Sequence, residues 1–439
     1  MATLPDSQFV AWFRSVAPYF RAFRDRTFVI AFGGEVVAAR KKLVALAHDL
    51  NLLHSADIRL VLVHGSRPQV ESQLKQRGAR SRYKDGLRIT DAVALECVKE
   101  AVGSLRVEID ALLSLSLHDS PMSGAAINTA SGNYITAQPY GVRNGVDFQY
   151  TGAVRKVDAQ AIKASLDAGN ITIVSNIGYS PTAEVFNCAM EDVAVATAKA
   201  IQADKLVFLT DAPVLDDRGR LVTELTAQNA DRLLSRANRM TEDTRLYLAH
   251  AVEAVRGGVP RGHLISHKVE GSLLIELFTR KGSGSMVTAD KLERLRAATI
   301  DDAAGIIGLI EPLEAEGILV YRGRELIERE IQRFFVLEHD GVIVGSAALY
   351  PFPSGSAAEL AALAVRPESQ GQGYGEKLLE HAVAEAKRRG LRRLFVLTTQ
   401  ATRWFIERGF TEQDPATLPE ERRTLYNYQR RSKVLAKKI

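Results

Sequence analysis

The sequence predicts an α/β domain built on a mainly parallel sheet, followed by a second domain of α+β type. Two patterns in the 439 residues carry this prediction. Up to about residue 280, short β-rich runs alternate with longer helical ones, which is typical of a parallel sheet with helices on both faces. Beyond that point, consecutive strands separated by a hairpin-type turn indicate an antiparallel arrangement.

The composition excludes several classes of protein. It is 46% hydrophobic and 25% charged, as in ordinary globular proteins, and the net charge of +5 is too small for this length to indicate nucleic-acid binding. The two cysteines, Cys97 and Cys188, form no zinc motif and exclude a disulfide framework, so we expect a reducing, cytoplasmic location. Since no apolar run approaches roughly 18 residues, we expect no membrane partner.

The first domain should contain at least five buried strands and five helices. The strands are expected at Thr27–Phe32, 58–63, 171–174, Lys205–Thr210 and 263–266, and the helices at 41–53, 70–77, 92–117, 192–201 and 242–256. Before them, aromatic residues at helical spacing predict an amphipathic helix over residues 7–25, with a kink at Pro18. This helix either packs on its own domain or is offered to a neighbouring subunit, and the sequence leaves both open.

The second domain should begin after a glycine-rich stretch at residues 281–290. We expect an N-terminal helix at 1–26, a first domain at 27–285, a linker at 286–293 and a second domain at 294–439. Within the second domain, the pattern predicts helices at 301–316 and 324–332, followed by strands at 333–338, 342–349 and 359–365.

The strongest chemical signal is the glycine-rich turn at residues 370–375, QGQGYG, between the strand at 359–365 and a predicted helix at 376–390. Glycines at such a turn let backbone N–H groups approach an anion closely, and the helix N-terminus adds partial positive charge. The turn matches neither GxGxxG nor GxxxxGK[ST], which argues against dinucleotide and ATPase sites.

The turn resembles the pyrophosphate loop of the GCN5-related acetyltransferases. The strand before it, the helix after it, the strand RLFVLTT and the segment WFIERGF at 404–410 follow in the order of that family. The resemblance implies that acetyl-CoA is a co-substrate and that no metal is needed. The residues it places at acetyl-CoA are Leu363, Val365, Gln370, Gly371, Gly373, Tyr374 and Gly375.

Acetyl transfer to an amine needs a base for the ammonium, a donor for the oxyanion and a means of stabilising the thiolate. Glu359 lies on the strand before the loop, where it could act as the base directly or through water. The backbone N–H near Leu363 is the expected oxyanion donor. Because Trp404 and Phe405 stand where many family members have a tyrosine acid, we name Thr398 as the substitute. At Ala362 the family often has cysteine, so only a backbone contact to the acceptor substrate is expected there.

The first domain resembles the amino-acid kinases, and acetylglutamate kinase in particular. The resemblance rests on FVIAFGGE, HGSR, GLRIT at 86–90, and Phe186-Asn187 followed by Asp192. The two lysines that those kinases use to neutralise the transferring phosphate are replaced by Ala31 and Tyr247. We therefore expect the fold without the kinase chemistry.

Together, the two domains resemble the bacterial N-acetylglutamate synthase family. That family implies acetyl transfer to the α-amino group of L-glutamate, with L-arginine as feedback inhibitor. Arg322 and Arg430 match its glutamate-binding arginines. An arginine guanidinium can donate two parallel hydrogen bonds to one carboxylate. A bifunctional synthase–kinase and an acetyltransferase for other amines, such as protein lysine, stay open as alternatives.

The segment at 261–286 resembles the arginine-binding region of arginine-sensitive relatives. The resemblance implies that Glu276 supplies a carboxylate to the effector and that the turn at Gly282 and Gly284 supplies carbonyls. It also implies a homo-oligomer, for example a hexamer, joined through the N-terminal helix and the kinase-like domain. In the same segment, His263 and His267 have metal-like spacing but no carboxylate nearby in sequence, so we expect surface histidines.

Overall fold

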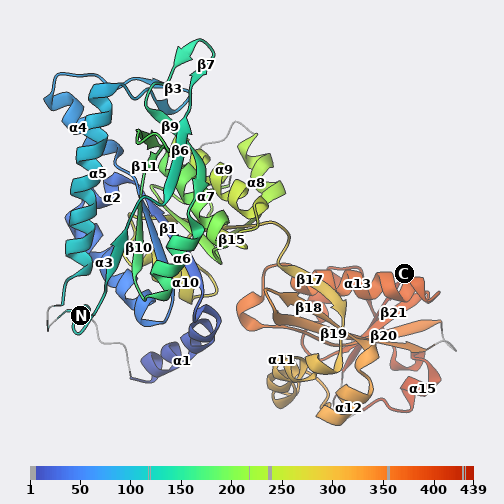
Figure 1. Cartoon of the computed structure of the whole chain (residues 1–439). Coiled ribbons are helices and arrows are strands. Elements are labelled where there is room, and N and C mark those ends of the chain that lie inside the picture. The colour runs from blue at the N-terminus through green and yellow to red at the C-terminus, as the bar shows by residue number, and fades with distance from the viewer. Residues whose placement is uncertain are drawn as a thin grey trace. The chain divides into compact units, whose positions relative to one another are not determined.

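The structure is a computed structural model of the chain, and it describes residues 6–116, 118, 120–216, 218–235, 240–352, 356–427, 430 and 432–439. The chain divides into two compact units, Met1–Asp290 and Lys291–Ile439 (Figure 1). Each unit has its own sheet and its own hydrophobic core. The expected architecture, a mainly parallel α/β sheet followed by an α+β unit, is confirmed.

The first unit is organised around an eight-stranded sheet in which all neighbouring strands are parallel except one antiparallel pair, β15 and β16. Apolar runs such as KLVFLT are continuous because the central strands are buried on both faces. In sheet order the strands are β14 (Glu224–Thr226), β16 (Ser285–Thr288), β15 (Arg261–Ser266), β13 (Lys205–Thr210), β1 (Thr27–Phe32), β2 (Arg59–His64), β10 (Ile171–Ser175) and β5 (Thr129–Ser131).

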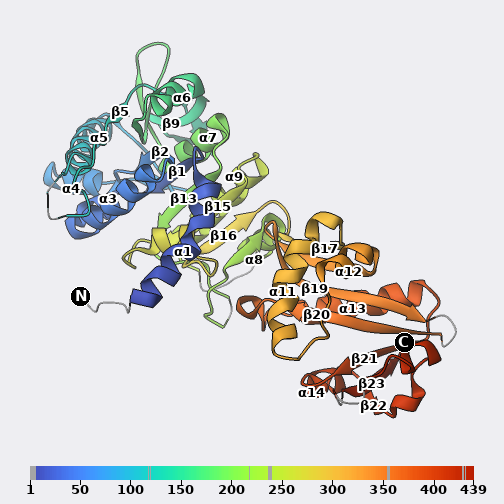
Figure 2. The same cartoon turned by 90° about the horizontal axis from the view of Figure 1, so that it is seen from below.

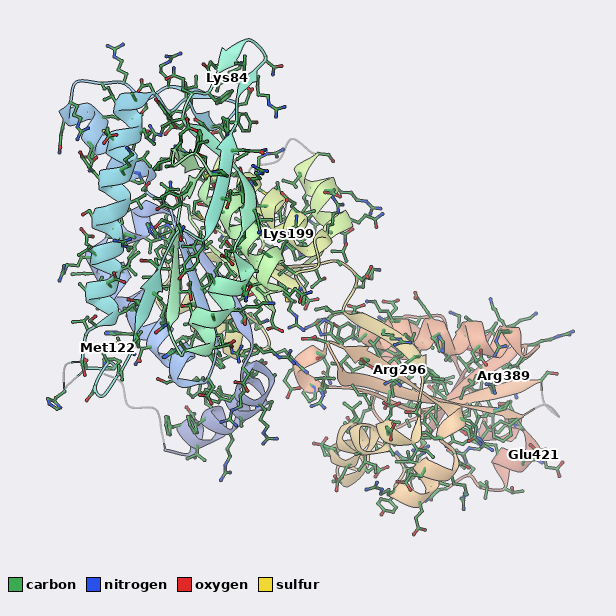
Figure 3. All side chains as sticks on the ribbon, viewed as in Figure 1. Lys84, Met122, Lys199, Arg296, Arg389 and Glu421 are labelled. Carbon is green, nitrogen blue, oxygen red and sulfur yellow. The ribbon has the colours of Figure 1, made fainter. Side chains whose placement is uncertain are left out.

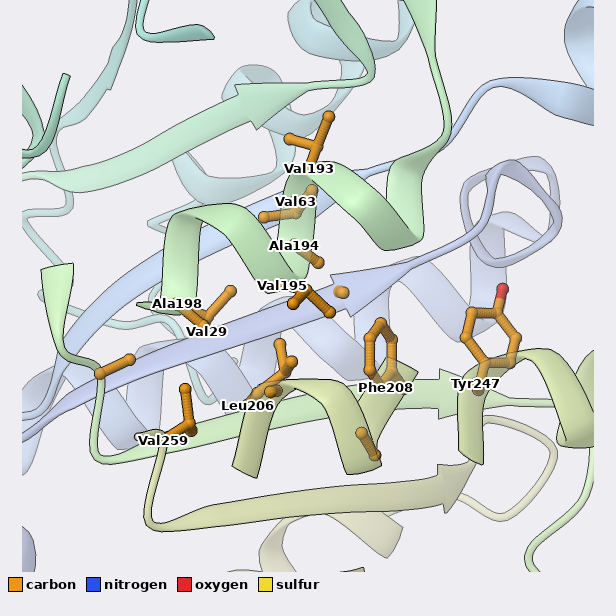
Figure 4. Packing of buried hydrophobic residues seen from close by; sticks show 14 of the residues in the cluster. Val29, Val63, Val193, Ala194, Val195, Ala198, Leu206, Phe208, Tyr247 and Val259 are labelled. Carbon is orange, nitrogen blue, oxygen red and sulfur yellow. The ribbon is translucent and has the colours of Figure 1, made fainter. Parts of the chain in front are cut away.

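Helices cover both faces of this sheet, as the alternation of side chains along β1 requires. Val29 and Ala31 pack with α7 (Met190–Ile201) and α9 (Glu242–Arg256), a layer shown in Figure 4. Phe28, Ile30 and Phe32 face α3 (Arg40–Ser55), α5 (Ala92–Leu113) and α10 (Ser272–Phe278) on the other side, and Figure 2 shows the two sets of helices from below. The remaining helices of the unit are α2 (Gly34–Ala38), α4 (Arg67–Gln76), α6 (Ala159–Asp167) and α8 (Ala227–Leu234).

A small β structure interrupts the strand–helix alternation, and the sequence pattern did not predict it. Its closed barrel is formed by β6 (Ile135–Pro139), β9 (Thr151–Val157), β11 (Ile177–Tyr179) and β12 (Val185–Cys188). Two hairpins accompany the barrel, β3 (Tyr83–Lys84) with β4 (Leu87–Arg88), and β7 (Val142–Arg143) with β8 (Val146–Asp147). The hairpin strands are short and largely exposed, and barrel strands such as β6 are only partly buried, so they lack the apolar runs by which the central strands are recognised.

The N-terminal helix α1 (Asp6–Phe23) is divided between a buried end and an exposed end. Val16 and Phe23 are buried, and the Phe23 ring lies 5.8 Å from that of Phe278 in α10. Toward the N-terminus, Trp12 and Phe13 are 52% and 56% exposed. The helix therefore packs on its own unit at one end and leaves an aromatic face uncovered at the other.

The expected linker at 286–293 needs a correction, because half of its residues lie in strands. Residues 285–288 form β16, which pairs with β15 on one side and β14 on the other. Its sequence SMVT reads as polar, yet Ser285, Val287 and Thr288 are buried within the sheet. Glu293 already belongs to β17 (Glu293–Ala297), which pairs with β18 (Phe334–His339) in the second unit.

The second unit is a seven-stranded sheet in which only β20 and β21 are parallel. In sheet order its strands are β17, β18, β19 (Val342–Phe352), β20 (Ala357–Val365), β21 (Arg393–Thr398), β23 (Lys433–Lys438) and β22 (Thr411–Gln413). α11 (Ala303–Ala315) and α12 (Arg324–Arg329) pack on one face of the sheet, and α13 (Tyr374–Arg388) packs on the other. Two short helices, α14 (Thr402–Ile406) and α15 (Glu420–Arg423), complete the unit.

A network of charges joins β17 to the start of α11. The Arg296 guanidinium, labelled in Figure 3, donates to the Asp302 carboxylate at 2.6 and 2.9 Å and to Glu338 at 2.9 Å. Asp302 also accepts from the Thr299 backbone N–H, as part of a capping box. The hydrogen bonds from Arg296 are the main reason that the pKa of Asp302 falls to about 2.

We expect Asp302→Asn to lower the free energy of unfolding of the second unit by about 2 kcal/mol at pH 7. A carboxyl with a depressed folded pKa stabilises the protein above its unfolded pKa, and this contribution is lost as the pH falls through the folded value. The difference between wild type and variant should therefore shrink between roughly pH 4 and pH 2. Urea unfolding measures it by Trp404 fluorescence in a Trp12→Phe background, because the sequence has only two tryptophans. An equal difference at both ends of this range would assign the effect to capping alone.

Candidate active site

A bulge in β20 shapes the centre of the candidate site. Ser346 and Ala348 of β19 pair with Ala364 and Ala361, so two residues of β20, Ala362 and Leu363, lie opposite one residue of β19. Ala362 has φ of +50°, the left-handed region that a side chain rarely adopts. Extra residues in a bulge stand outside the regular ladder, and bulges of this kind often lie at active sites.

The sheet opens beside the bulge. β20 and β21 pair from Ala357 to Glu359, and the register ends there, although both strands continue. The two strands therefore diverge beyond Glu359. The predicted site residue Thr398 ends β21, where its hydroxyl accepts from the Ala401 N–H at 2.9 Å.

The glycine-rich turn leads from the end of β20 into α13. Gly371 and Gly373 have φ of +79° and +80°, so glycine is required at both positions. Gly373 is the N-cap of the fifteen-residue α13, and no side chain caps this helix end. The Gln370 amide turns back to the Val365 carbonyl, at 3.4 Å. The turn thus presents backbone at a helix N-terminus, as the sequence predicted.

The start of α13 corrects the sequence reading by two residues. Tyr374 and Gly375 lie in the first turn of the helix, not before it. The Tyr374 side chain is buried in the core, so it can serve a ligand only through its backbone. A Cβ atom at Gly375 would lie 3.3 Å from the Trp404 ring, so this glycine lets α14 approach α13.

Glu359 forms an ion pair that the sequence reading missed. Arg422 of α15 donates from Nε to Oε2 at 2.5 Å and from Nη2 to Oε1 at 3.2 Å. The Glu359 and Arg422 side chains are only 9% and 17% exposed. In Figure 3, the labelled Glu421 marks α15. Arg422 is one of many arginines near the C-terminus, and nothing in its local sequence distinguishes it.

Two further arginines lie close to this pair. The Arg430 guanidinium donates to the carbonyls of Gly317 and Ile318 at 3.2 and 2.5 Å, which ties it to the segment that precedes Arg322. Burial and the positive charges of Arg322 and Arg422 lower the pKa of Arg430. The guanidinium groups of Arg322 and Arg422 therefore both act on Arg430, and Arg422 also contacts Glu359. Arg322 and Arg430 were predicted site residues.

In the first unit, Tyr247 and Ala31 stand at the two positions where the sequence resemblance implies kinase lysines. Tyr247 is buried in α9, and its ring centroid lies 5.1 Å from that of Phe208 (Figure 4). Its pKa is raised by burial and by four carboxylates, those of Glu35, Glu191, Asp211 and Asp243. Ala31 is buried in β1 and offers no charge. Neither Tyr247 nor Ala31 offers a cation to a phosphoryl group.

Glu276 of α10 lies in a buried network with His263 of β15. Its carboxylate accepts from the N–H groups of Ser283 and Gly284 at 2.8 and 2.7 Å, and His263 Nδ1 lies 2.8 Å from Oε1. Burial opposes the charge, but these hydrogen bonds hold the pKa of Glu276 below its ordinary value. The turn with Gly282, whose φ is +64°, directs N–H groups toward Glu276, whereas carbonyls had been expected.

The network continues from His263 to a buried lysine. His263 Nε2 lies 3.5 Å from Lys205 Nζ, and this ammonium lies over the Phe23 ring of α1 at 5.1 Å. Burial and then the Lys205 charge lower the pKa of His263 to about 4, so it is neutral at pH 7. Lys205 was missed because it lies at the start of an apolar strand and reads as a strand end.

The prediction of surface histidines was wrong. The His263 and His267 side chains are 3% and 6% exposed, and each contacts a carboxylate, Glu276 and Asp211, at 2.8 and 2.7 Å. These carboxylates are distant in sequence and come close only in the folded sheet. In the described parts of the chain, no three His, Cys, Asp or Glu side chains are grouped as a metal site. No described helix is long and apolar enough to cross a bilayer.

Comparisons with known proteins agree with this geometry. Residues 26–266 match the model of the amino acid kinase family, and residues 308–410 match that of the acetyltransferase (GNAT) family. An amino-acid acetyltransferase of Ralstonia nicotianae is 53% identical over 438 residues, which span 100% of this chain and 97% of that protein. The chain belongs to the amino-acid acetyltransferase family.

Further members of the amino-acid acetyltransferase family and solved structures extend the likeness over the whole chain. The enzyme of Pseudomonas syringae pv. syringae is 49% identical and covers 98% of this chain and 100% of its own. An N-acetylglutamate synthase of Neisseria gonorrhoeae, solved with coenzyme A and L-arginine, is 38% identical with a TM-score of 0.88, covering 98% of this chain and 99% of that one. The same enzyme, solved with coenzyme A and N-acetyl-glutamate, matches with a TM-score of 0.63.

Proposed function

We propose that this acetyltransferase is an N-acetylglutamate synthase, which transfers an acetyl group from acetyl-CoA to the α-amino group of L-glutamate. The observation that carries the proposal is the group of three arginines, Arg322, Arg422 and Arg430, of which Arg422 pairs with Glu359. Glutamate has two carboxylates and one ammonium, so such a group complements its charges. The gonococcal relative solved with N-acetyl-glutamate supports this choice of acceptor.

We assign acetyl-CoA to the opening between β20 and β21, where it would supply the acetyl group as an activated thioester. The first-turn N–H groups of α13 have no partners within the helix and attract an anion such as a diphosphate. The left-handed glycines of the turn allow close approach of that anion. We assign the diphosphate to the backbone of Gln370, Gly371, Gly373, Tyr374 and Gly375, and the adjoining arm to the backbone of Leu363 and Val365.

Glu359 is the proposed general base. Its carboxylate has about four lone-pair positions, and Arg422 uses one on each oxygen. The remaining positions can accept the proton of the glutamate ammonium, directly or through water. Arg422 fixes the carboxylate in one orientation, which a base needs for efficient proton transfer.

Backbone groups at the bulge of β20 and a hydroxyl at the end of β21 complete the proposed site. Leu363 lies beside Ala362 at the irregularity of β20, where its N–H is the proposed donor to the acetyl oxygen. The backbone of Ala362 is assigned to the acceptor amino acid. The Thr398 hydroxyl accepts from Ala401, so its own hydrogen stays available, and we assign it to the departing sulfur.

Thiol release from acetyl-CoA in the presence of each of the twenty amino acids tests the proposed function. We expect saturable release with L-glutamate alone. Release that depends on protein lysine and not on glutamate would favour the alternative acceptor class. We also propose that the chain does not phosphorylate N-acetylglutamate, since Ala31 and the buried Tyr247 leave a phosphoryl group without cations.

L-Arginine is the proposed inhibitor, bound at the network of Glu276, His263 and Lys205. The buried carboxylate of Glu276 suits a guanidinium, and the Lys205 ammonium suits an α-carboxylate. Because Gly282 and Gly284 have no side chains, the turn can pack closely against Glu276 and against β15. The gonococcal relative solved with L-arginine supports this ligand.

We expect Glu276→Gln to relieve inhibition by L-arginine at least tenfold, with the uninhibited kcat within a few-fold of wild type. Losing one charge of a buried pair with a guanidinium typically costs about 2–5 kcal/mol of binding. The amide keeps an acceptor for the N–H groups of Ser283 and Gly284, which a change to alanine would leave unsatisfied. Inhibition curves for L-arginine measure the effect. If arginine at millimolar concentration changes neither rate nor melting temperature of wild type, the effector site is absent.

The uncovered aromatic face of α1 is the proposed subunit contact of a homo-oligomer. Phe9, Trp12 and Phe13 are each about half exposed, and the Phe9 and Phe13 rings stack at 6.0 Å. Such a face is typical of an interface between subunits. The other end of α1 lies over Lys205, so assembly and effector binding would act on one helix. We propose a cytoplasmic location for the enzyme.

A further inference from the structure

Tyr350 lies beside the proposed base but was not among the predicted site residues. It is directly opposite Glu359 in the antiparallel pairing of β19 and β20. Directly opposed residues of an antiparallel pair point to the same face of the sheet, with Cβ atoms roughly 5 Å apart. The face is the one that α11 and α12 cover, and Tyr350 packs against the core cluster there.

The Tyr350 hydroxyl links two groups of opposite charge. It donates to Glu330 Oε2 at 2.8 Å. Burial and this hydrogen bond raise the pKa of Tyr350, whereas the charge and hydrogen bond of Arg322 lower it. Arg333 contacts both Tyr350 and Glu330. Its guanidinium lies over the Tyr350 ring at 4.8 Å, and its Nη1 lies 3.7 Å from Glu330 Oε1.

The proposed site should bind the carboxylates of the substrate, yet it already contains the carboxylate of Glu330. An unrestrained Glu330 would pair with Arg322, and this internal ion pair would compete with the acceptor amino acid. The Tyr350 hydroxyl and Arg333 satisfy Glu330 where it stands.

We propose that Tyr350 is a positioning residue of the acceptor site. Its hydroxyl holds Glu330 and so leaves the guanidinium of Arg322 for a carboxylate of the acceptor amino acid. The inference rests on the proposed function, because it names the residue that keeps one arginine of that site available. It does not give Tyr350 a part in proton transfer.

Tyr350→Phe removes the hydroxyl and keeps the ring under Arg333. We expect the KM for L-glutamate to rise about tenfold, while kcat and the KM for acetyl-CoA stay within about twofold of wild type. The pH profile of kcat should be unchanged. A fall in kcat together with a changed profile would instead make Tyr350 a proton donor and would overturn the assignment.

A second substitution separates this role from a loss of packing. If Glu330 competes for Arg322 in the variant, then Tyr350→Phe combined with Glu330→Gln should restore the KM for glutamate to within about threefold of wild type. The matched control is Glu328→Gln in the same background, because Glu328 is a neighbouring carboxylate of α12 that pairs with Arg324 at 2.6 Å. The control should restore nothing. Equal behaviour of the two double variants would overturn the inference.

The outcomes also separate the inference from the proposed function. A wild-type chain that does not acetylate glutamate would overturn both. A wild type that does so, with a KM for glutamate unchanged by Tyr350→Phe, would overturn the role of Tyr350 alone.

Discussion

Glu359→Gln is expected to lower kcat by about 10²–10³, with the KM for acetyl-CoA nearly unchanged. General-base catalysis contributes rate factors of this order, and glutamine cannot take the proton of the ammonium. The glutamine keeps a hydrogen-bond acceptor for Arg422. A smaller residue at this position would leave the largely buried guanidinium without its partner. The variant should also lose the acidic limb of its pH–rate profile. Steady-state rates across the pH range measure both effects.

Chemical rescue distinguishes a lost base from a disturbed site. In Glu359→Ala, the space beside Arg422 can admit formate, and formate should restore part of the rate in a saturable manner. A variant that merely disturbs the site would show no such dependence. A kcat of Glu359→Gln within about threefold of wild type would remove Glu359 from the mechanism.

The sequence is informative about the fold where burial is complete. The central strands β1, β2 and β13 are buried on both faces, so their apolar runs predicted them to within a residue. β16 was missed because a four-residue strand such as SMVT takes its burial from β14 and β15, not from its own composition. The β6–β9–β11–β12 barrel was missed for the same reason, since its short strands carry little apolar pattern of their own.

The candidate site shows where sequence reasoning ends. The glycine turn was found because left-handed backbone at Gly371 and Gly373 demands a residue type that the sequence displays. The partners Arg422 and Lys205 were not found, because an ion pair across 63 positions or a lysine under a distant helix leaves no local pattern. His263 was misjudged because its carboxylate, Glu276, comes close only through the turn from β15 into α10.

The arginines beside Glu359 carry the second large expected effect. Arg322→Ala and Arg430→Ala should each raise the KM for L-glutamate by at least about 30-fold, roughly 2 kcal/mol, with little change in the KM for acetyl-CoA. We expect the lower end of the usual range for lost charge pairs because both side chains remain partly exposed to solvent. Saturation curves for each substrate, with the other held constant, measure the two KM values.

A control variant in α15 separates substrate binding from a general effect of positive charge. Arg423→Ala removes one arginine from α15, but this side chain is exposed and lies next to Arg422 in sequence. It should leave the KM for glutamate within about twofold of wild type, since an exposed charge contributes little through solvent. Arg430→Ala should be the more harmful of the two predicted variants, because its guanidinium also holds the carbonyls of Gly317 and Ile318 ahead of Arg322. If Arg322→Ala and Arg430→Ala both have the wild-type KM for L-glutamate, other residues bind the carboxylates of the acceptor.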